Sequence, residues 1–62
     1  MYVLQRVPDG QYVAPPGQPA SYTDRLEEAR IYASHAEARH DQCVENEIIV
    51  SLDSLLRGGR RP

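Results

Sequence analysis

Proline and glycine interrupt the first third of the chain and leave room there only for short extended segments. Pro8-Asp9-Gly10 is a strong turn signal, because proline presets φ, aspartate caps the turn and glycine accepts positive φ. The flanking residues are β-branched, aromatic and aliphatic, so residues 1–14 are predicted to form a β-hairpin with a short loop. Residues 15–20, with the sequence PPGQPA, are predicted to form a polyproline-like surface loop without regular structure.

One helix is predicted in the middle of the chain, and a capping box marks its start. Ser34 and Glu37 have the spacing in which the serine side chain accepts the third helical N–H. The helix is expected to run from about His35 to Gln42 or Cys43 and to contact a sheet through one face, made of Ala36, His40, Cys43 and Val44. Before it, residues 21–23 are expected to form a short strand, 24–28 a helical turn and 29–32 an extended segment. The alternative is a single helix from Thr23 to Cys43, against which the extended Ile31-Tyr32 and the internal capping box both argue.

The last apolar segment, residues 47–52, is the strongest strand signal in the chain. Its triplet Ile48-Ile49-Val50 predicts a strand that is covered on both faces and therefore central in its sheet. One closing helical turn is expected over residues 52–56. Together these elements predict an α+β fold, in which a small antiparallel sheet of three to five short strands carries one main helix on one face. Residues 1–56 are expected to form this single domain, and residues 57–62 a flexible basic tail.

The length of the chain limits what its interior can hold. A chain of 62 residues buries only about 60 % of its unfolded surface, so the core is marginal and a deep substrate cleft is not expected. Cys43 is the only cysteine, which rules out an internal disulfide. The N-terminus lacks the features of a signal peptide, and no apolar run approaches the roughly 20 residues that span a bilayer. We therefore expect a cytoplasmic protein with no membrane partner.

Catalytic and metal chemistry find little support in the sequence. His40 and Cys43 have a spacing compatible with a shared metal, but a structural zinc site needs four ligands and only His35 remains as a second imidazole. The same pair could act as base and nucleophile, yet no third orienting group is evident. The glycines do not form a phosphate-binding loop. The sequence therefore predicts no enzyme, no cofactor and no metal.

Charge is unevenly distributed along the chain, whose formal net charge is −2. Residues 24–53 hold eight acids against three arginines, whereas the last six residues carry three arginines and no acid. An acidic body favours basic surfaces on a partner. The expected protein-binding residues are five acids and two tyrosines, namely Asp24, Glu27, Glu28, Glu37, Asp41, Tyr12 and Tyr22. The alternative function is a small nucleic-acid-binding accessory protein, because Arg57-Gly58-Gly59-Arg60-Arg61 resembles a fragment of an RNA-contacting arginine-glycine segment.

A series of short motifs extends over nearly the whole chain: Tyr2-Val3-Leu4-Gln5-Arg6, Asp9-Gly10, Tyr12-Val13-Ala14, Ser21-Tyr22-Thr23, Ala29-Arg30-Ile31-Tyr32, Ser34 and Glu37-Ala38. In these motifs the chain is similar to small uncharacterised α+β proteins of bacteria and their phages. By size and acidic middle it also resembles phage-encoded inhibitors of host defence, including anti-CRISPR proteins. The resemblance implies no catalytic residue. It implies a protein that occludes a basic site on a larger host protein, and whether a second copy completes the small core stays open.

Overall fold

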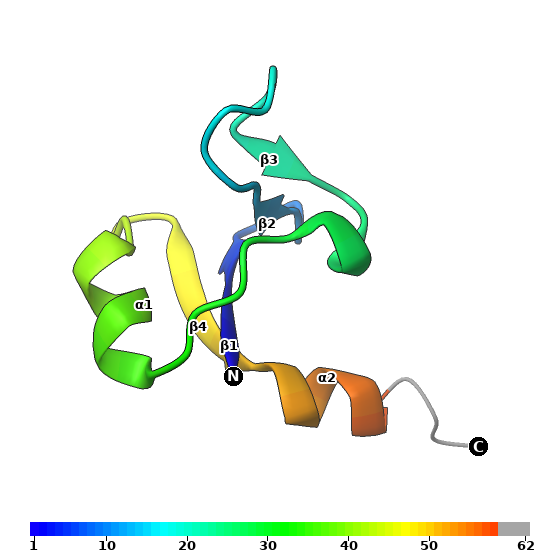
Figure 1. The fold of residues 1–62 in the computed structure, drawn as a ribbon, viewed down its shortest axis with the longest axis vertical. Helices are drawn as coiled ribbons and strands as arrows, with labels where there is room; N and C mark the ends of the chain where they lie inside the picture. Colours follow the sequence, from blue (N-terminus) through cyan, green and yellow to red (C-terminus); the bar gives the residue numbers. More distant parts are fainter. Residues whose placement is uncertain (59–62) are drawn as a thin grey trace.

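The computed structural model describes residues 1–58 and contains a four-stranded antiparallel sheet of order β3-β2-β1-β4. The strands are β1 (Tyr2–Arg6), β2 (Tyr12–Val13), β3 (Tyr22–Thr23) and β4 (Glu47–Ser51). The helical elements are a 3₁₀ turn η1 (Leu26–Glu28), the main helix α1 (His35–Asp41) and a short helix α2 (Leu52–Gly58). Figure 1 shows α1 on one side of β1 and β4, with η1 and α2 on the other side. The predicted α+β fold is confirmed, with a short second helix in addition.

The N-terminal hairpin forms as predicted, because its turn satisfies the backbone groups that it exposes. Gly10 has a φ of +80° and donates its N–H to the carbonyl oxygen of Arg6 at 2.7 Å. This left-handed conformation favours glycine, which has no Cβ to clash. The hairpin pairs Gln5 with Tyr12, and β3 then pairs with β2 after the irregular proline loop of residues 15–20. The predicted hairpin, loop and third strand are therefore confirmed.

The prediction that Ile48-Ile49-Val50 forms a central strand is wrong. Strand β4 pairs with β1 alone and lies at one edge of the sheet. The side chain of Ile48 is 45 % exposed, whereas Val3 and Leu4 of β1 are fully buried. A β-branched run fits any partly buried pleated strand, so its composition does not report how many neighbouring strands it has.

Helix α1 begins where the sequence predicts. The side-chain oxygen of Ser34 accepts a hydrogen bond from the N–H of Glu37 at 3.2 Å. The alternative single helix from residue 23 to residue 43 does not form, because Tyr32 is extended and pairs with Tyr2 in an antiparallel bridge. Each of these two tyrosines donates its backbone N–H to the other's carbonyl oxygen at 2.8 Å.

The predicted contact face of this helix is wrong. The helix ends at Asp41, earlier than expected, so Cys43 and Val44 lie beyond it. The residue that packs against the sheet is Ala38, which is fully buried, while the four expected contact residues are exposed: Ala36, His40, Cys43 and Val44. A helix of only two turns has room for one close contact with a sheet, and alanine has the small side chain that such an approach requires.

The core is small. Leu4, Tyr32 and Ala38 form its buried centre, with Tyr2, Val13 and Ile49 packed partly against it. Helix α2 packs on β1 and β4. It continues to Gly58, two residues past the predicted closing turn. Residues 59–62, the rest of the predicted tail, lie outside the described residues. Within residues 1–58, no helix is both long and apolar enough to cross a membrane.

Candidate functional site

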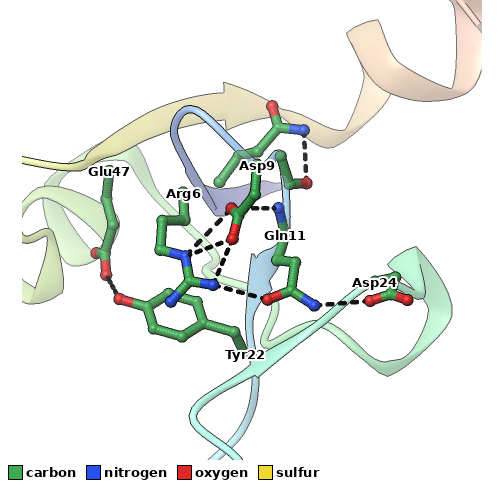
Figure 2. Close-up of polar contacts among 8 residues, drawn as sticks. Arg6, Asp9, Gln11, Tyr22, Asp24 and Glu47 are labelled. Atoms are coloured by element: carbon green, nitrogen blue, oxygen red, sulfur yellow. Dashed lines mark hydrogen bonds and ion pairs between the residues drawn. The ribbon is translucent and has the colours of Figure 1, made fainter.

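Three strands bring Arg6, Tyr22 and Glu47 together on one face of the sheet. The β1–β4 register places Arg6 opposite Glu47, and directly opposed residues share a face. The hydroxyl of Tyr22 donates to Oε2 of Glu47 at 2.6 Å, and the guanidinium carbon of Arg6 lies 4.0 Å from the centre of the Tyr22 ring (Figure 2). Strands β1, β3 and β4 are thus joined through side chains.

Glu47 is a buried carboxylate held by hydrogen bonds. Its side chain is 6 % exposed, and its Oε1 accepts the backbone N–H of Cys43 at 2.9 Å. The side-chain nitrogen of Gln42 donates to the backbone oxygen of Glu47 at 2.6 Å. A buried charge is costly unless such partners satisfy it. The hydrogen bond to Glu47, followed by burial, raises the pKa of Tyr22 above its ordinary value, so the phenol stays a donor to higher pH than a free tyrosine does.

A second set of contacts extends from Arg6 to the edge of the sheet. The Arg6 guanidinium pairs with Asp9, which lowers the pKa of that carboxyl, and its Nη2 donates to Oε1 of Gln11 at 2.8 Å. The side-chain nitrogen of Gln11 then donates to Oδ1 of Asp24 at 2.8 Å (Figure 2). These polar groups satisfy one another, so the network is suited to holding the hairpin against β3 and β4.

An open groove of about 520 Å³ lies at the β3 edge, between the proline loop and η1. Its residues include Pro15 and Pro19 from the loop, Thr23 from β3, and Glu27 and Glu28 from η1. One wall is therefore proline-rich and apolar, and the other carries two exposed carboxylates. We refer to it as the proline groove. Tyr22 also lines it, although its hydroxyl is bonded to Glu47.

The acids beside the proline groove are only partly neutralised. Arg25 contacts Glu27 at 2.8 Å and Glu28 at 3.6 Å, and all three side chains are more than half exposed. A hydrogen bond to its own backbone N–H, followed by the contact with Arg25, lowers the pKa of Glu27. Asp24 is exposed, and its carboxylate is held by the Gln11 amide rather than by a cation. Two carboxylates share the Arg25 guanidinium, and within residues 1–58 Asp24 has no cation partner, which leaves this end of the molecule acidic.

The other two predicted acids lie elsewhere. Glu37 and Asp41 belong to α1, on the opposite side of the sheet from η1 (Figure 1). Asp41 accepts the hydroxyl of Tyr32 at 2.7 Å and an Arg30 nitrogen at 3.0 Å. The structure thus separates the five predicted acids into two sets. Tyr12 is half-buried on β2, away from α1.

Sequence reasoning missed two parts of this arrangement. Glu47 was counted only in the charge of residues 24–53, yet it is buried, and the proline loop was expected as a surface loop, yet it lines a groove. A signal for the first existed, because side chains two apart in a strand share a face, and apolar Ile49 shares the face of Glu47 and packs partly against the core. Within residues 1–58, no group of three or more histidine, cysteine or acidic side chains could hold a metal ion, and the thiol of Cys43 is free and exposed.

No family model matches this chain, and neither the curated proteins nor the solved structures contain a match to it. A functional assignment therefore starts from the geometry of its own residues, in particular from the proline groove and its acidic wall.

Proposed function

We propose that this chain is a non-enzymatic protein-binding module whose proline groove holds a basic segment of a larger protein. One observation carries the proposal: an open groove of about 520 Å³ has Pro15 and Pro19 on one wall and the exposed carboxylates of Glu27 and Glu28 on the other. Such a groove offers apolar contact and charge to one extended segment.

The two walls favour different parts of the same ligand. Proline has a fixed φ, so Pro15 and Pro19 lose little conformational freedom when a partner packs on them. The carboxylates of Glu27 and Glu28 are suited to charge-assisted hydrogen bonds with arginine or lysine. Asp24 adds a third negative charge nearby, and Arg25 offsets only one of the three. A segment that combines arginine or lysine with small or apolar residues fits both walls.

The mechanism that we propose is occlusion of a basic site by shape and charge. The resemblance to small bacterial and phage proteins supports a narrower form, in which the chain is a phage- or prophage-encoded inhibitor of a host protein. The nucleic-acid alternative depends on residues 57–62, of which 59–62 lie outside the described residues, and no structural observation favours it. Self-association with a second copy concerns another surface and is compatible with this function.

The test compares two double charge reversals that alter net charge equally. Glu27→Arg with Glu28→Arg changes the groove wall, whereas Glu37→Arg with Glu45→Arg changes exposed acids outside the groove. The probe is a fluorescein-labelled peptide of alternating arginine and proline, measured by anisotropy, with a glutamate-proline peptide as the negative ligand. We expect the groove variant to bind at least roughly tenfold more weakly and the matched control to change less than about threefold.

The groove variant should stay close to the parent's melting temperature, because exposed ion pairs contribute little to folding. The control should lose a few degrees at most, since Glu37 lies in the first turn of α1, and both variants must be folded at the assay temperature. Equal losses in the two variants would show that binding follows net charge alone. An undiminished affinity in the groove variant would remove the proline groove as the binding site.

A further inference from the structure

The free edge of β4 has backbone groups that the fold leaves without partners. Leu52 donates its N–H to Met1, and Val7 donates its N–H to Asn46, which fixes the hydrogen-bonding phase of the β1–β4 pair. Bonded and non-bonded pairs alternate along an antiparallel ladder. Residues 48 and 50 therefore direct their N–H and C=O groups to β1, whereas residues 47, 49 and 51 direct theirs away from the sheet.

The outward groups are satisfied at Glu47, and the outward carbonyl of Ser51 accepts the first hydrogen bond of α2, which begins at Leu52. At Glu47, the N–H donates to the carbonyl oxygen of Cys43 at 2.8 Å, and the carbonyl accepts the Gln42 side chain at 2.6 Å. Within residues 1–58, no loop or side chain forms a hydrogen bond with the outward N–H of Ile49 or of Ser51. The open groups of the edge are thus the N–H and carbonyl of Ile49 and the N–H of Ser51.

The two edges of the sheet differ in how they are protected. Strand β3 has only two residues and is bounded by the proline loop and Asp24. Strand β4 has five residues, with no proline and no charged residue from Ile48 to Ser51. Edge strands are normally shortened, charged or covered to prevent pairing with another chain. The β4 edge lacks these protections.

Exposed apolar side chains lie around the same edge. Ile48 is 45 % exposed on β4, Val44 is 80 % exposed in the turn before it, and Val7 is 42 % exposed beside the paired Asn46. Only five hydrophobic residues of the described chain are buried, and two of these are alanines. Domains of this size commonly need oligomerisation or another support to complete so small a core.

We propose that β4 pairs antiparallel with β4 of a second copy, around a two-fold axis at Val50. In this register Ile49 faces Ser51 of the other copy. The free N–H of Ser51 meets the free carbonyl oxygen of Ile49, and the free N–H of Ile49 meets the second lone pair of the Ser51 carbonyl, whose first is used by the opening turn of α2. Val50 faces itself, and Ile48 lies beside the start of α2 of the other copy, which begins at Leu52. Residues 48–51 carry no charge, so two copies of the strand can pair without bringing like charges together.

This pairing leaves the proline groove free. The groove lies at the β3 edge, and β3 and β4 are the two ends of the strand order. Two copies joined at β4 therefore carry their grooves at the far ends of one continuous sheet, where they could engage a partner with two basic sites and gain affinity through effective concentration. Dimerisation itself does not depend on the proposed groove function.

The experiment measures the oligomeric state of the full chain by analytical ultracentrifugation from about 5 to about 500 µM. Ile48→Lys places a charge at the edge, and Ile31→Lys is its matched control, since Ile31 is 43 % exposed outside the sheet. We expect a concentration-dependent dimer whose dissociation constant rises at least roughly tenfold in Ile48→Lys and less than about twofold in Ile31→Lys.

Amide hydrogen exchange on the unmodified chain provides a second readout that does not depend on a variant. Protection at Ile49 and Ser51 should rise with protein concentration, whereas Ile48 and Val50, which bond β1, should be protected at every concentration. A chain that stays monomeric to about 500 µM overturns the proposal. So does a dimer that Ile48→Lys leaves intact and that shows no added protection at Ile49.

Discussion

Replacing Tyr22 with phenylalanine should lower the free energy of unfolding by about 1.5–3 kcal/mol. The change removes one hydroxyl, which donates to Oε2 of Glu47 at 2.6 Å. The acceptor is 6 % exposed, so water cannot readily replace the lost donor. Hydrogen bonds to charged groups fall in this range, and a domain of 62 residues has only roughly 3–9 kcal/mol of stability in total. The substitution should therefore remove a large share of it.

The assay is urea unfolding followed by circular dichroism, with Tyr12→Phe as the matched control. Tyr12 is also a half-buried strand tyrosine, but within the described residues its hydroxyl forms no hydrogen bond. With a slope near 1 kcal/mol per molar urea, Tyr22→Phe should shift the midpoint by about 1.5–3 M. The control should stay within about 0.5 kcal/mol of the parent.

A double-mutant cycle with Glu47→Gln measures how far the effect of Tyr22→Phe depends on the carboxylate of Glu47. Glutamine keeps the shape of the side chain but has a single, neutral acceptor oxygen, for which the Tyr22 hydroxyl and the Cys43 N–H compete; a hydrogen bond to it contributes at most about 1 kcal/mol. Tyr22→Phe should then cost less in the Glu47→Gln background than in the parent. Two results would refute the reasoning: a Tyr22→Phe effect as small as that of Tyr12→Phe, or the same effect in both backgrounds.

Two further substitutions test other parts of the fold. Ser34→Ala removes the side chain that caps α1 and should cost about 0.5–2 kcal/mol in thermal unfolding, while a change below about 0.3 kcal/mol would show that the cap is dispensable. Burial, followed by the hydrogen bond to Asp41, raises the pKa of Tyr32 to about 12, so the fold favours the neutral phenol. Its stabilising contribution is present below about pH 10 and is lost as the pH rises towards 12. Between pH 9 and pH 12 the parent should therefore lose roughly 2–3 kcal/mol more free energy of unfolding than Tyr32→Phe does in urea titrations. Equal losses in the two proteins would show that the raised pKa of Tyr32 does not contribute to stability.

The local elements of the fold could be predicted because their signals lie in neighbouring residues. Pro8-Asp9-Gly10 specifies a turn through its own φ preferences, and Ser34 with Glu37 specifies a helix start through one hydrogen bond. The edge position of β4 could not be predicted in this way. It follows from the pairing of β1 with β2 on one side and β4 on the other, which is a contact between distant parts of the chain.

The candidate site, too, could be predicted from the sequence only where its residues are neighbours in the chain. The sequence shows which residues are acidic, and Glu27 and Glu28 do lie exposed together because they are adjacent in one turn. It does not show that helix α1, with Glu37 and Asp41, lies across the sheet from them (Figure 1). Nor does it show that Glu47 is buried and bonded to the hydroxyl of Tyr22 (Figure 2). The order of charged residues in the sequence does not give their positions on the surface, because a binding surface depends on which segments the fold brings to the same side.

The sequence by itself determined the α+β class, the hairpin, the irregular proline loop and the helix start, since each depends on backbone preferences and on hydrogen bonds over a few residues. Only the tertiary structure decided that the proline loop forms a groove with η1, that Glu47 leaves the surface, and that β4 keeps a free edge. These features depend on contacts between residues far apart in the chain, such as the bond between Tyr22 and Glu47. In a domain with so few buried residues, such contacts determine which polar groups find partners and which remain exposed.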